Sequence, residues 1–314
     1  MSSLSDRFNA EFGAAHKQYV PLPENEAEST FDQLMHSHAV RSEFFSEPLP
    51  HPAHPRIFAV SNQKGGVGKT TTAVNIAAAL AKGGLSVLVI DCDPQGNAST
   101  ALGVKPPAGD PSVYHTLTQD LPLREVMYQC PDIETLFVVP ATIDLSMAEV
   151  ELVMSDRREY RLRDSLSAFF GLPEADRIHF DYVFIDSPPS LGMLTLNALV
   201  AAREVLIPIQ AEYYALEGLT QLMATIHKVR ESFNPELRIS TIVLTMFDKR
   251  TNLANDVAAD VAQYFSDELL ATRIPRNVRI SEAPSFGQTI ISYDLRSAGA
   301  AAYLAAAKEI ALRS

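Results

Sequence analysis

Short, uninterrupted apolar runs alternate with helix-length segments through most of this 314-residue chain. Uninterrupted apolar runs are typical of strands buried on both faces, because a half-exposed strand alternates apolar with polar residues. The runs that predict strands are 57–61, 87–91, 136–139, 182–186, 205–209 and 239–245, with 269–274 as a further candidate. The helix-length segments are 70–82, 145–170, 194–201, 216–232, 255–264 and 298–313. This alternation predicts an α/β protein with a doubly wound, mostly parallel sheet flanked by helices.

A glycine-rich turn joins the first predicted strand to the first predicted helix. Small residues in such a turn let backbone N–H groups approach phosphate oxygens, and the helix N-terminus adds partial positive charge. Lys69 can reach the terminal phosphates of a nucleotide, and the Thr70 hydroxyl can coordinate Mg²⁺. The common pattern GxxxxGK[ST] is not met, because Gln63 occupies the first glycine position and Lys64 is an additional lysine. The turn predicts a nucleotide site made by Lys64, Gly65, Gly66, Val67, Gly68, Lys69, Thr70 and Thr71.

The segment from Lys64 to Thr70 resembles the deviant Walker A motif of the ParA/MinD ATPases, which are P-loop NTPases. The resemblance implies ATP and Mg²⁺ as cofactors and an ATP-dependent homodimer. It also implies that Lys64 reaches across this nucleotide sandwich to the partner's phosphates, so that Lys64 and Lys69 both serve catalysis. Two facing ATP molecules need such added cations to offset their negative charge.

Carboxylates follow two other predicted strands. Strand 87–91 runs into Asp93, and strand alternation places Asp91 and Asp93 on the same side. One of these carboxylates can orient the waters of Mg²⁺ and the other can orient the attacking water. Resemblance to the family's switch I implies the water-activating role for Asp93, which leaves Asp91 with the metal. Strand 182–186 ends in Asp186, a Walker B signature in which the carboxylate holds Mg²⁺ through water.

Segments 208–218, 244–253 and 274–285 resemble ParA more than other members, so the resemblance spans about residues 57–310. It implies that four residues surround adenine: Met246, Phe247, Pro275 and Asn277. Core packing at a strand end explains Met246 and Phe247 equally well.

The same resemblance implies that Arg250 and Arg279 line a surface that contacts DNA phosphates. Lysine and arginine contacts to phosphates release counterions, so binding is sensitive to salt and independent of base sequence. Ion pairs with Asp248 or Glu282 are the alternative explanation for these two arginines.

The net charge of −12 first argues against a nucleic-acid partner. Residues 1–55 carry eight acids, three bases and several prolines, which is typical of a mostly disordered leader. A short helix at 30–40 is an alternative within this leader. Residues 56–314 are predicted to form the ATPase domain, and their remaining charge of −7 permits a small basic face that dimerisation doubles.

The two cysteines, Cys92 and Cys130, form no disulfide framework and no CxxC pair. The first ten residues lack the apolar core of a signal peptide, and no apolar run reaches the roughly 18 residues of a membrane span. A cytoplasmic, nucleoid-associated protein without membrane binding is expected.

The leading hypothesis is a DNA-partitioning ATPase that binds double-stranded DNA non-specifically and is stimulated by a ParB-like partner. A MinD-like membrane regulator would need a basic amphipathic C-terminal helix, whereas residues 305–314 are alanine-rich. A ParA-like positioner of protein cargo stays open. A metal-cluster carrier would need cysteines that meet across the dimer, and a small-molecule ligase would leave the loops of Arg250 and Arg279 unexplained.

Overall fold

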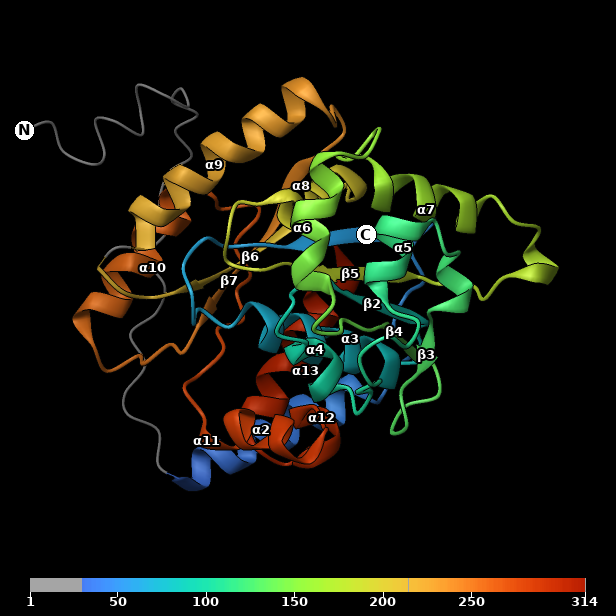
Figure 1. Cartoon of the computed structure of the whole chain (residues 1–314). Helices are drawn as coiled ribbons and strands as arrows, with labels where there is room; N and C mark the ends of the chain where they lie inside the picture. The colour runs from blue at the N-terminus through green and yellow to red at the C-terminus, as the bar shows by residue number, and fades with distance from the viewer. Residues whose placement is uncertain (1–29, 214, 314) are drawn as a thin grey trace, which may run out of the picture.

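The computed structural model describes residues 30–213 and 215–313, with side chains described from residue 35 onward. One seven-stranded sheet crosses the middle of the molecule in the order β3-β4-β2-β5-β1-β6-β7 (Figure 1). Neighbouring strands are parallel except for the edge pair β3 and β4. The strands are β1 (Arg56–Val60), β2 (Val87–Asp91), β3 (Tyr128–Gln129), β4 (Leu136–Val139), β5 (Tyr182–Asp186), β6 (Glu204–Gln210) and β7 (Arg238–Thr245). The predicted doubly wound, mostly parallel sheet is confirmed.

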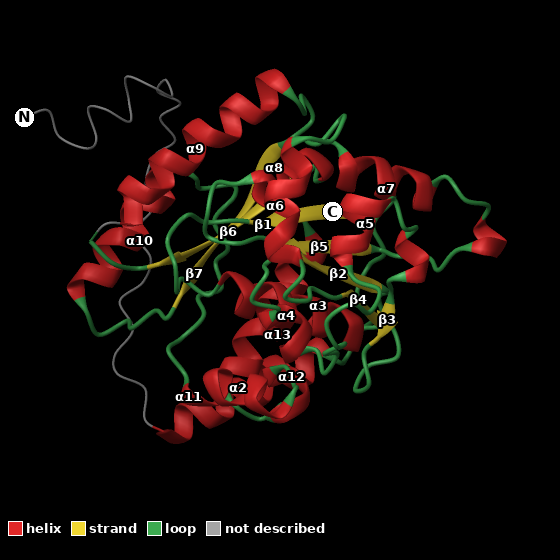
Figure 2. Ribbon diagram, in the orientation of Figure 1, coloured by secondary structure: helices red, strands yellow, loops and turns green. Residues whose placement is uncertain are grey.

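Helices cover both faces of the sheet and close two apolar cores (Figure 2). One face is covered by α5 (Val113–Gln119), α6 (Leu145–Val153), α7 (Arg161–Phe170), α8 (Met193–Ala201), α9 (Ala215–Ser232) and α10 (Asn252–Tyr264). The other is covered by α2 (Thr30–Phe44), α3 (Lys69–Lys82), α4 (Asn97–Ala101), α11 (Val278–Glu282), α12 (Ile290–Tyr293) and α13 (Ala298–Leu312). The central strands are therefore buried on both sides, as their uninterrupted apolar runs require.

Two details differ from the sequence prediction. Segment 145–170 is not one helix: it divides into α6 and α7, and Arg157 between them has a positive φ of 53°. Ser155 and Asp156 precede this turn, and both residue types compete with helical hydrogen bonding through their side chains. Segment 269–274 contributes only an isolated bridge between Leu269 and Ile242 rather than a strand.

The predicted leader is partly packed against the ATPase domain. Residues 1–29 lie outside the described residues, but residues 30–44 form α2, which extends the helix expected at 30–40. Phe44 and Leu49 are buried in the core with α3 and α13, and Glu43 pairs with Lys308 at 2.8 Å. The prediction of a mostly disordered leader therefore does not hold for residues 35–55, because apolar side chains such as Phe44 and Leu49 hold this part on the domain.

Helix α13 packs against α3 and α2 rather than standing apart from the domain. Its alanine-rich sequence allows close approach on several sides, and most of its residues from Gly299 to Ala311 are buried. Across the described ranges, no helix combines the length and the apolar character needed to cross a membrane.

Candidate nucleotide site

Three central strands end at the same level of the sheet. Val60 at the end of β1 pairs with Asp186 at the end of β5, and Asp186 pairs in turn with Asp91 at the end of β2. The glycine-rich loop leaves β1 at this edge and leads into α3. The register therefore brings the loop and the predicted metal-binding carboxylates together, at the edge where ligands bind in parallel α/β sheets.

The glycine loop has a backbone that other residues would not readily adopt. Gly66 has φ of 76° and Gly68 has φ of 87°, both in the left-handed region. A Cβ atom added to Gly65 or Gly66 would meet nothing within 4 Å, so open space lies beside the loop. The Thr245 hydroxyl donates a 2.8 Å hydrogen bond to the Val67 carbonyl and fixes the middle of the loop. Backbone N–H groups at the start of α3 can therefore face a bound phosphate.

Asn62 positions the start of the same loop, a role that the sequence analysis missed. Its side-chain nitrogen donates to the Pro208 carbonyl at 2.8 Å, and its oxygen accepts from the Lys64 N–H at 3.0 Å. Asn62 is buried, so these bonds also satisfy its own polar atoms.

The two lysines of the loop have different surroundings. Lys69 is buried and its ammonium donates to the Lys64 carbonyl at 3.3 Å. Burial lowers the pKa of Lys69, and the nearby charges of Asp186 and Asp93 offset part of this effect. Lys64 instead turns out of the loop, and its half-exposed ammonium forms an ion pair with Glu212. The sequence analysis gave no role to Glu212, although it lies in one of the segments that resemble ParA.

Asp186 is fully buried, and neither of its carboxylate oxygens has a hydrogen-bond partner among the described residues. Burial raises the pKa of Asp186 well above its ordinary value, and the charge of Asp91 adds to this effect. The Thr70 hydroxyl and the Lys69 ammonium lie near enough to lower the same pKa in part, although neither makes a hydrogen bond of ordinary geometry to Asp186. A buried, unpaired carboxylate is costly unless a cation or donors satisfy it. Asp186 and Thr70 are oxygen donors of the kind that Mg²⁺ binds, so this part of the site fits the metal.

Asp91 is buried beside Asp186 but accepts several hydrogen bonds. One of its oxygens accepts from the Ser99 N–H at 2.8 Å and from the Ser99 hydroxyl at 2.6 Å, and the other accepts from the Asp93 N–H at 3.2 Å. Burial raises the pKa of Asp91 to about 6 despite these bonds. Asp91 thus ties the Asp93 loop to α4 and has fewer free lone pairs for a metal than Asp186.

The remaining predicted catalytic residue, Asp93, lies in a turn directly after β2. Its side-chain oxygen accepts from the Gln95 N–H at 3.0 Å, and its own carbonyl accepts from the Gly96 N–H at 2.9 Å. Asp93 is close enough to contribute to the pKa of Lys69 and of Asp186. The structure therefore gathers Asp93, Lys69 and Asp186 into one charged cluster.

The predicted adenine residues come from two segments that run side by side. Phe247 forms a bridge with Pro275, and its N–H donates to the Ile274 carbonyl at 2.9 Å. Met246 has a positive φ of 49°, which is uncommon for a residue with a side chain. The Asn277 side chain caps α11 by accepting from the Arg279 N–H at 2.9 Å. Met246, Phe247, Pro275 and Asn277 are thus held in one region next to the end of β7.

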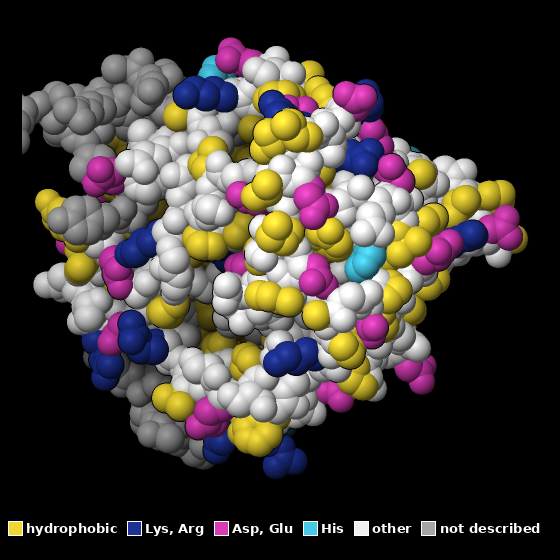
Figure 3. Space-filling view, viewed as in Figure 1, with side chains coloured by type: hydrophobic (Ala, Val, Ile, Leu, Met, Phe, Trp, Pro, Cys, Tyr) yellow, Lys and Arg dark blue, Asp and Glu magenta, His cyan; other side chains and the backbone are white. Residues whose placement is uncertain are grey.

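The predicted DNA-contacting arginines are exposed and bound to neighbouring carboxylates. Arg250 donates two side-chain hydrogen bonds to Asp248, and this contact lowers the pKa of Asp248 to about 2. Arg279 pairs with Glu282 at 3.1 Å. Figure 3 shows lysine and arginine side chains gathered beside α10, the helix that begins directly after the Arg250 loop. The ion pairs predicted as the alternative are therefore present, and exposed pairs of this kind exchange readily for other anions.

Comparison with known proteins agrees with this geometry. A family described as an AAA domain matches residues 55–239. The chromosome partitioning protein ParA of Myxococcus xanthus is 51% identical over 258 residues, which cover 82% of this chain and 88% of that protein. The sporulation initiation inhibitor protein Soj of Bacillus subtilis is 50% identical over 256 residues, covering 82% of this chain and 98% of that protein.

Solved structures show the same fold. A structure named cobyrinic acid a,c-diamide synthase from Mycobacterium smegmatis, with bound ADP and magnesium, is 39% identical with a TM-score of 0.66. The match covers 80% of this chain and 91% of the synthase chain. The cell division ATPase MinD of Pyrococcus furiosus is 24% identical with a TM-score of 0.65, covering 82% of this chain and 98% of that chain. The sequence identities to ParA and Soj, together with the phosphate loop and its buried carboxylates, show that the chain belongs to the ParA family of chromosome-partitioning ATPases.

Proposed function

We propose that this ATPase is a nucleotide-gated DNA-binding dimer. ATP and Mg²⁺ close a sandwich of two copies, and the closed dimer binds double-stranded DNA without reading its sequence. Hydrolysis is slow until a ParB-like protein stimulates it and so releases the DNA. Such a protein is cytoplasmic and associated with the nucleoid, and its cycle moves or segregates DNA.

The observation that carries this proposal is the contrast between the two lysines of one loop. Lys69 is buried inside the loop, where an ammonium can meet the phosphates of a nucleotide bound to the same chain. Lys64 points outward, is half-exposed and is held by Glu212. Two ATP phosphate groups attract an ammonium more strongly than one carboxylate does, so an approaching partner's nucleotide can draw Lys64 away from Glu212. ATP would thus supply the charge that holds the dimer.

Within each copy, the residues have separate tasks. Backbone N–H groups from Gly65 to Thr71 and the Lys69 ammonium would bind the phosphates. Four residues would surround adenine: Met246, Phe247, Pro275 and Asn277. Thr70 and Asp186, with Asp91 beside them, would hold Mg²⁺, which offsets phosphate charge when bound. Asp91 would support this centre, since its bonds to Ser99 and to the Asp93 N–H fix the carboxyl end of β2.

Asp93 is assigned to the attacking water. Its carboxylate is short, lies in a turn fixed by Gly96, and is placed near Lys69 and Asp186. A carboxylate beside the reacting phosphate can orient the attacking water by accepting a hydrogen bond from it. With Asp93 alone to orient the water, ATP hydrolysis would be slow, as expected of an ATPase that a partner protein stimulates.

Arg250 and Arg279 are assigned to DNA phosphates. Both guanidinium groups are exposed: Arg250 pairs with Asp248, and Arg279 interacts with Glu282, Asp294 and the Tyr293 hydroxyl. Phosphate can replace exposed partners of this kind. Two copies would present four such arginines. The membrane-regulator alternative has less support, because α13 is buried against α3 and α2 and offers no free apolar face.

The test measures ATP hydrolysis and DNA retention in the same preparations. The wild-type rate should be low alone and should rise when random-sequence duplex and a ParB-like protein from the same source are both added. Arg250→Ala combined with Arg279→Ala should remove DNA retention and the added stimulation, while the rate without DNA stays unchanged. Exchange of the exposed Arg230 on α9 for alanine is the matched control. Unchanged DNA retention in the double variant would place the DNA surface elsewhere.

A further inference from the structure

A second concavity lies at the edge of the sheet opposite the nucleotide site. It encloses about 410 Å³ and includes Ile57 near the start of β1 and residues 200–203, which run from the end of α8 to the residue before β6. Three arginines line it, from α7, from the loop before β5 and from the loop before β6: Arg163, Arg177 and Arg203. We call this concavity the arginine pocket. Its volume lies in the range of about 300–1,000 Å³ that is typical of small-molecule sites.

The arginine pocket is positive in a protein that is acidic as a whole. The only carboxylate among its lining residues is Glu236, against three guanidinium groups. The whole chain carries a net charge of −12, so this concentration of arginines is not a consequence of composition. A concave site with low-dielectric walls focuses the electrostatic field of such charges, so it attracts anions more strongly than a flat surface does.

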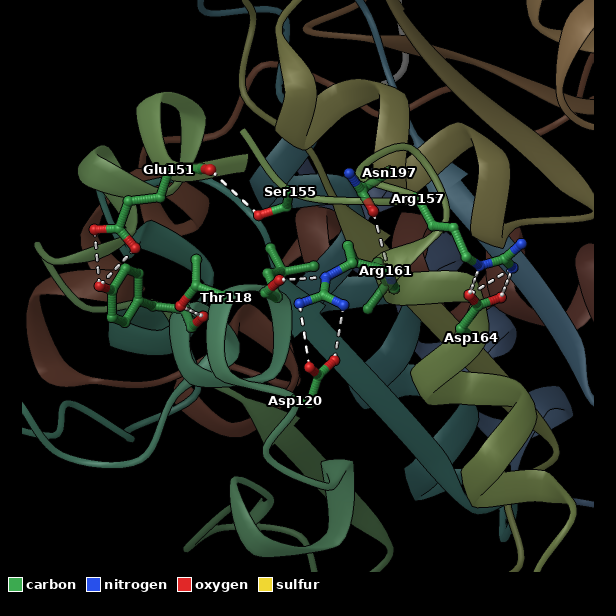
Figure 4. A network of polar contacts seen from close by, with 11 residues as sticks. Thr118, Asp120, Glu151, Ser155, Arg157, Arg161, Asp164 and Asn197 are labelled. Carbon is green, nitrogen blue, oxygen red and sulfur yellow. Dashed lines mark hydrogen bonds and ion pairs between the residues drawn. The ribbon is translucent and has the colours of Figure 1, made fainter. Parts of the chain in front are cut away.

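Neighbouring arginines outside the pocket are fully paired. Arg157 donates three hydrogen bonds to Asp164, and Arg161 faces Asp120 and the Leu117 carbonyl (Figure 4). Arg56, at the start of β1, binds both oxygens of Glu204. Paired guanidinium groups are thus the rule in this part of the molecule.

The pocket arginines are less well paired, and Arg177 departs from that rule altogether. Arg177 makes no hydrogen bond or ion pair with any described residue, and its Nε atom is buried without a partner. Its guanidinium group instead lies 5.9 Å from the centre of the Phe170 ring. Arg163 is 3.8 Å from Asp164, whose oxygens already accept from Arg157, and Arg203 is 3.3 Å from the exposed Glu236. A buried guanidinium N–H without an acceptor is costly, and an anion would supply the acceptor.

The remaining wall is mostly apolar, with Ile57, Leu166, Phe170 and Val200 among its residues, and also includes three uncharged polar side chains, His54, Ser167 and Asn234. A ligand for this pocket therefore needs several anionic oxygens at one end and an apolar or flat group at the other. Phosphate suits three guanidinium groups better than a single carboxylate does, because it offers more oxygens and up to two negative charges. We propose that the arginine pocket binds a small organic phosphate of the size of a nucleoside monophosphate.

The pocket is built on rigid elements that also lead to the nucleotide site. Helix α8 begins directly after the loop that follows Asp186 and ends at Ala201 in the pocket wall. Asn197 on α8 accepts from the Leu162 N–H and donates to the Arg158 carbonyl, which ties α7 to α8 (Figure 4). The arginines are thus carried by a fixed frame, as a preformed binding site requires.

The proposal is tested by measuring whether a ligand protects individual arginines from chemical modification. Because each arginine is measured separately, binding in the pocket is distinguished from binding at the phosphate loop. The full chain, saturated with ADP and Mg²⁺, is treated with phenylglyoxal with and without guanosine monophosphate, and modified peptides are measured by mass spectrometry. Guanosine monophosphate should protect Arg163, Arg177 and Arg203 several-fold, while the exposed Arg230 reacts as before. Guanosine without phosphate should protect none of them.

Calorimetric titration of the same ADP-loaded protein with guanosine monophosphate then tests each arginine. Arg177→Met and Arg203→Gln should each weaken binding about tenfold or more, the loss expected for one charge-assisted contact. Arg230→Gln should bind like the wild type. Arg203 is largely exposed, so its variant keeps the test valid if Arg177→Met fails to fold.

The proposal would be overturned if guanosine monophosphate did not protect the pocket arginines. It would also be overturned if neither Arg177→Met nor Arg203→Gln changed the affinity for guanosine monophosphate. Protection by random-sequence duplex without protection by guanosine monophosphate would also overturn it, because the arginines would then form part of a nucleic-acid surface. None of these outcomes depends on Arg250 and Arg279, so the proposed DNA surface stands or fails separately.

Discussion

Buried carboxylates at the two ends of the central strands have opposite surroundings. We call the end where these parallel strands begin the amino edge of the sheet and the end where they finish the carboxyl edge. At the amino edge, Glu204 is buried and Arg56 donates hydrogen bonds of 2.8 and 2.7 Å to its two oxygens. At the carboxyl edge, Asp186 is equally buried and both of its oxygens lack a hydrogen-bond partner among the described residues. Asp186 is the last residue of β5 and Glu204 is the first residue of β6, and both strands lie next to β1. Their positions in the fold are therefore comparable.

This difference separates what holds the fold together from what binds the ligand. A buried charge with its own partner is already satisfied, so losing that partner destabilises the fold, whereas a buried charge without a partner is satisfied only when a ligand arrives. Substitutions at the carboxyl edge should therefore change ligand binding more than folding. Substitutions at the amino edge should change folding more than ligand binding.

The largest effect is expected for Lys69→Ala. Removing the buried ammonium takes away the main positive charge for the phosphates, so affinity for ATP should fall by roughly 100-fold or more. Unfolding by urea should change little, because the Lys69 hydrogen bond to the Lys64 carbonyl is long, at 3.3 Å, and the cost of burying the ammonium opposes its attraction to Asp186 and Asp93. Equilibrium dialysis with labelled ATP measures the loss, and retained affinity would remove Lys69 from the phosphate site.

Arg56→Met should have the largest effect on folding. It leaves Glu204 buried with only the Ser240 hydroxyl and Arg238, at 3.4 Å, as partners among the described residues, so the free energy of unfolding should fall by about 3 kcal/mol. Thermal unfolding measures this, and ATP affinity should stay within twofold of the wild type. The double variant Arg56→Met with Glu204→Leu is the control, and it should recover most of the lost stability. A single variant as stable as the wild type would show that the pair contributes nothing.

Asp186→Asn should change the free energy of unfolding by a smaller amount than Arg56→Met, and should raise it rather than lower it. Removing an unpaired buried charge should raise the nucleotide-free stability by about 1–2 kcal/mol, while Mg²⁺-dependent turnover is lost. Thermal unfolding with and without ATP and Mg²⁺ separates the two consequences. If the variant were less stable than the wild type without ligand, then Asp186 would be structural and the contrast between the edges would fail.

The smallest effect concerns pH and the Glu204 carboxylate. Burial alone would raise the pKa of Glu204, but the hydrogen bonds and charge of Arg56 outweigh it and hold the pKa below its ordinary value. Its contribution to stability is therefore complete above the unfolded-state pKa of about 4.5 and disappears as the pH falls through the lower folded-state pKa. The stability difference between wild type and Glu204→Gln should be constant from neutral pH down to that value and shrink below it. A difference that grows on acidification would contradict this sign.

Much of the fold and of the site followed from local sequence. Apolar runs predicted the central strands, and the order of strand, glycine turn and helix predicted the positions of Lys69 and Asp186. Those features depend on neighbours in sequence and on the rule that ligands bind at the carboxyl ends of parallel strands.

The features that sequence reasoning missed are contacts between distant segments. Lys64 pairs with Glu212, which lies 148 residues away, and Asn62 binds the Pro208 carbonyl. No local pattern specifies these partners, because they meet only through the packing of β1 beside β6. Burial of Phe44 and Leu49 was missed for the same reason, since acidic residues and prolines dominate the composition around them.

The central claim is that ATP, by drawing Lys64 to a partner's nucleotide, assembles a DNA-binding dimer. The most direct measurement is sedimentation velocity on Asp93→Ala, which should retain ATP because its water-orienting carboxylate is absent. With ATP, Mg²⁺ and a random-sequence duplex, this variant should sediment as a dimer on DNA, whereas with ADP it should remain a monomer free of DNA. Adding Lys64→Ala should abolish the dimer. Equal DNA binding with ADP and ATP, or an undiminished dimer without Lys64, would contradict the account.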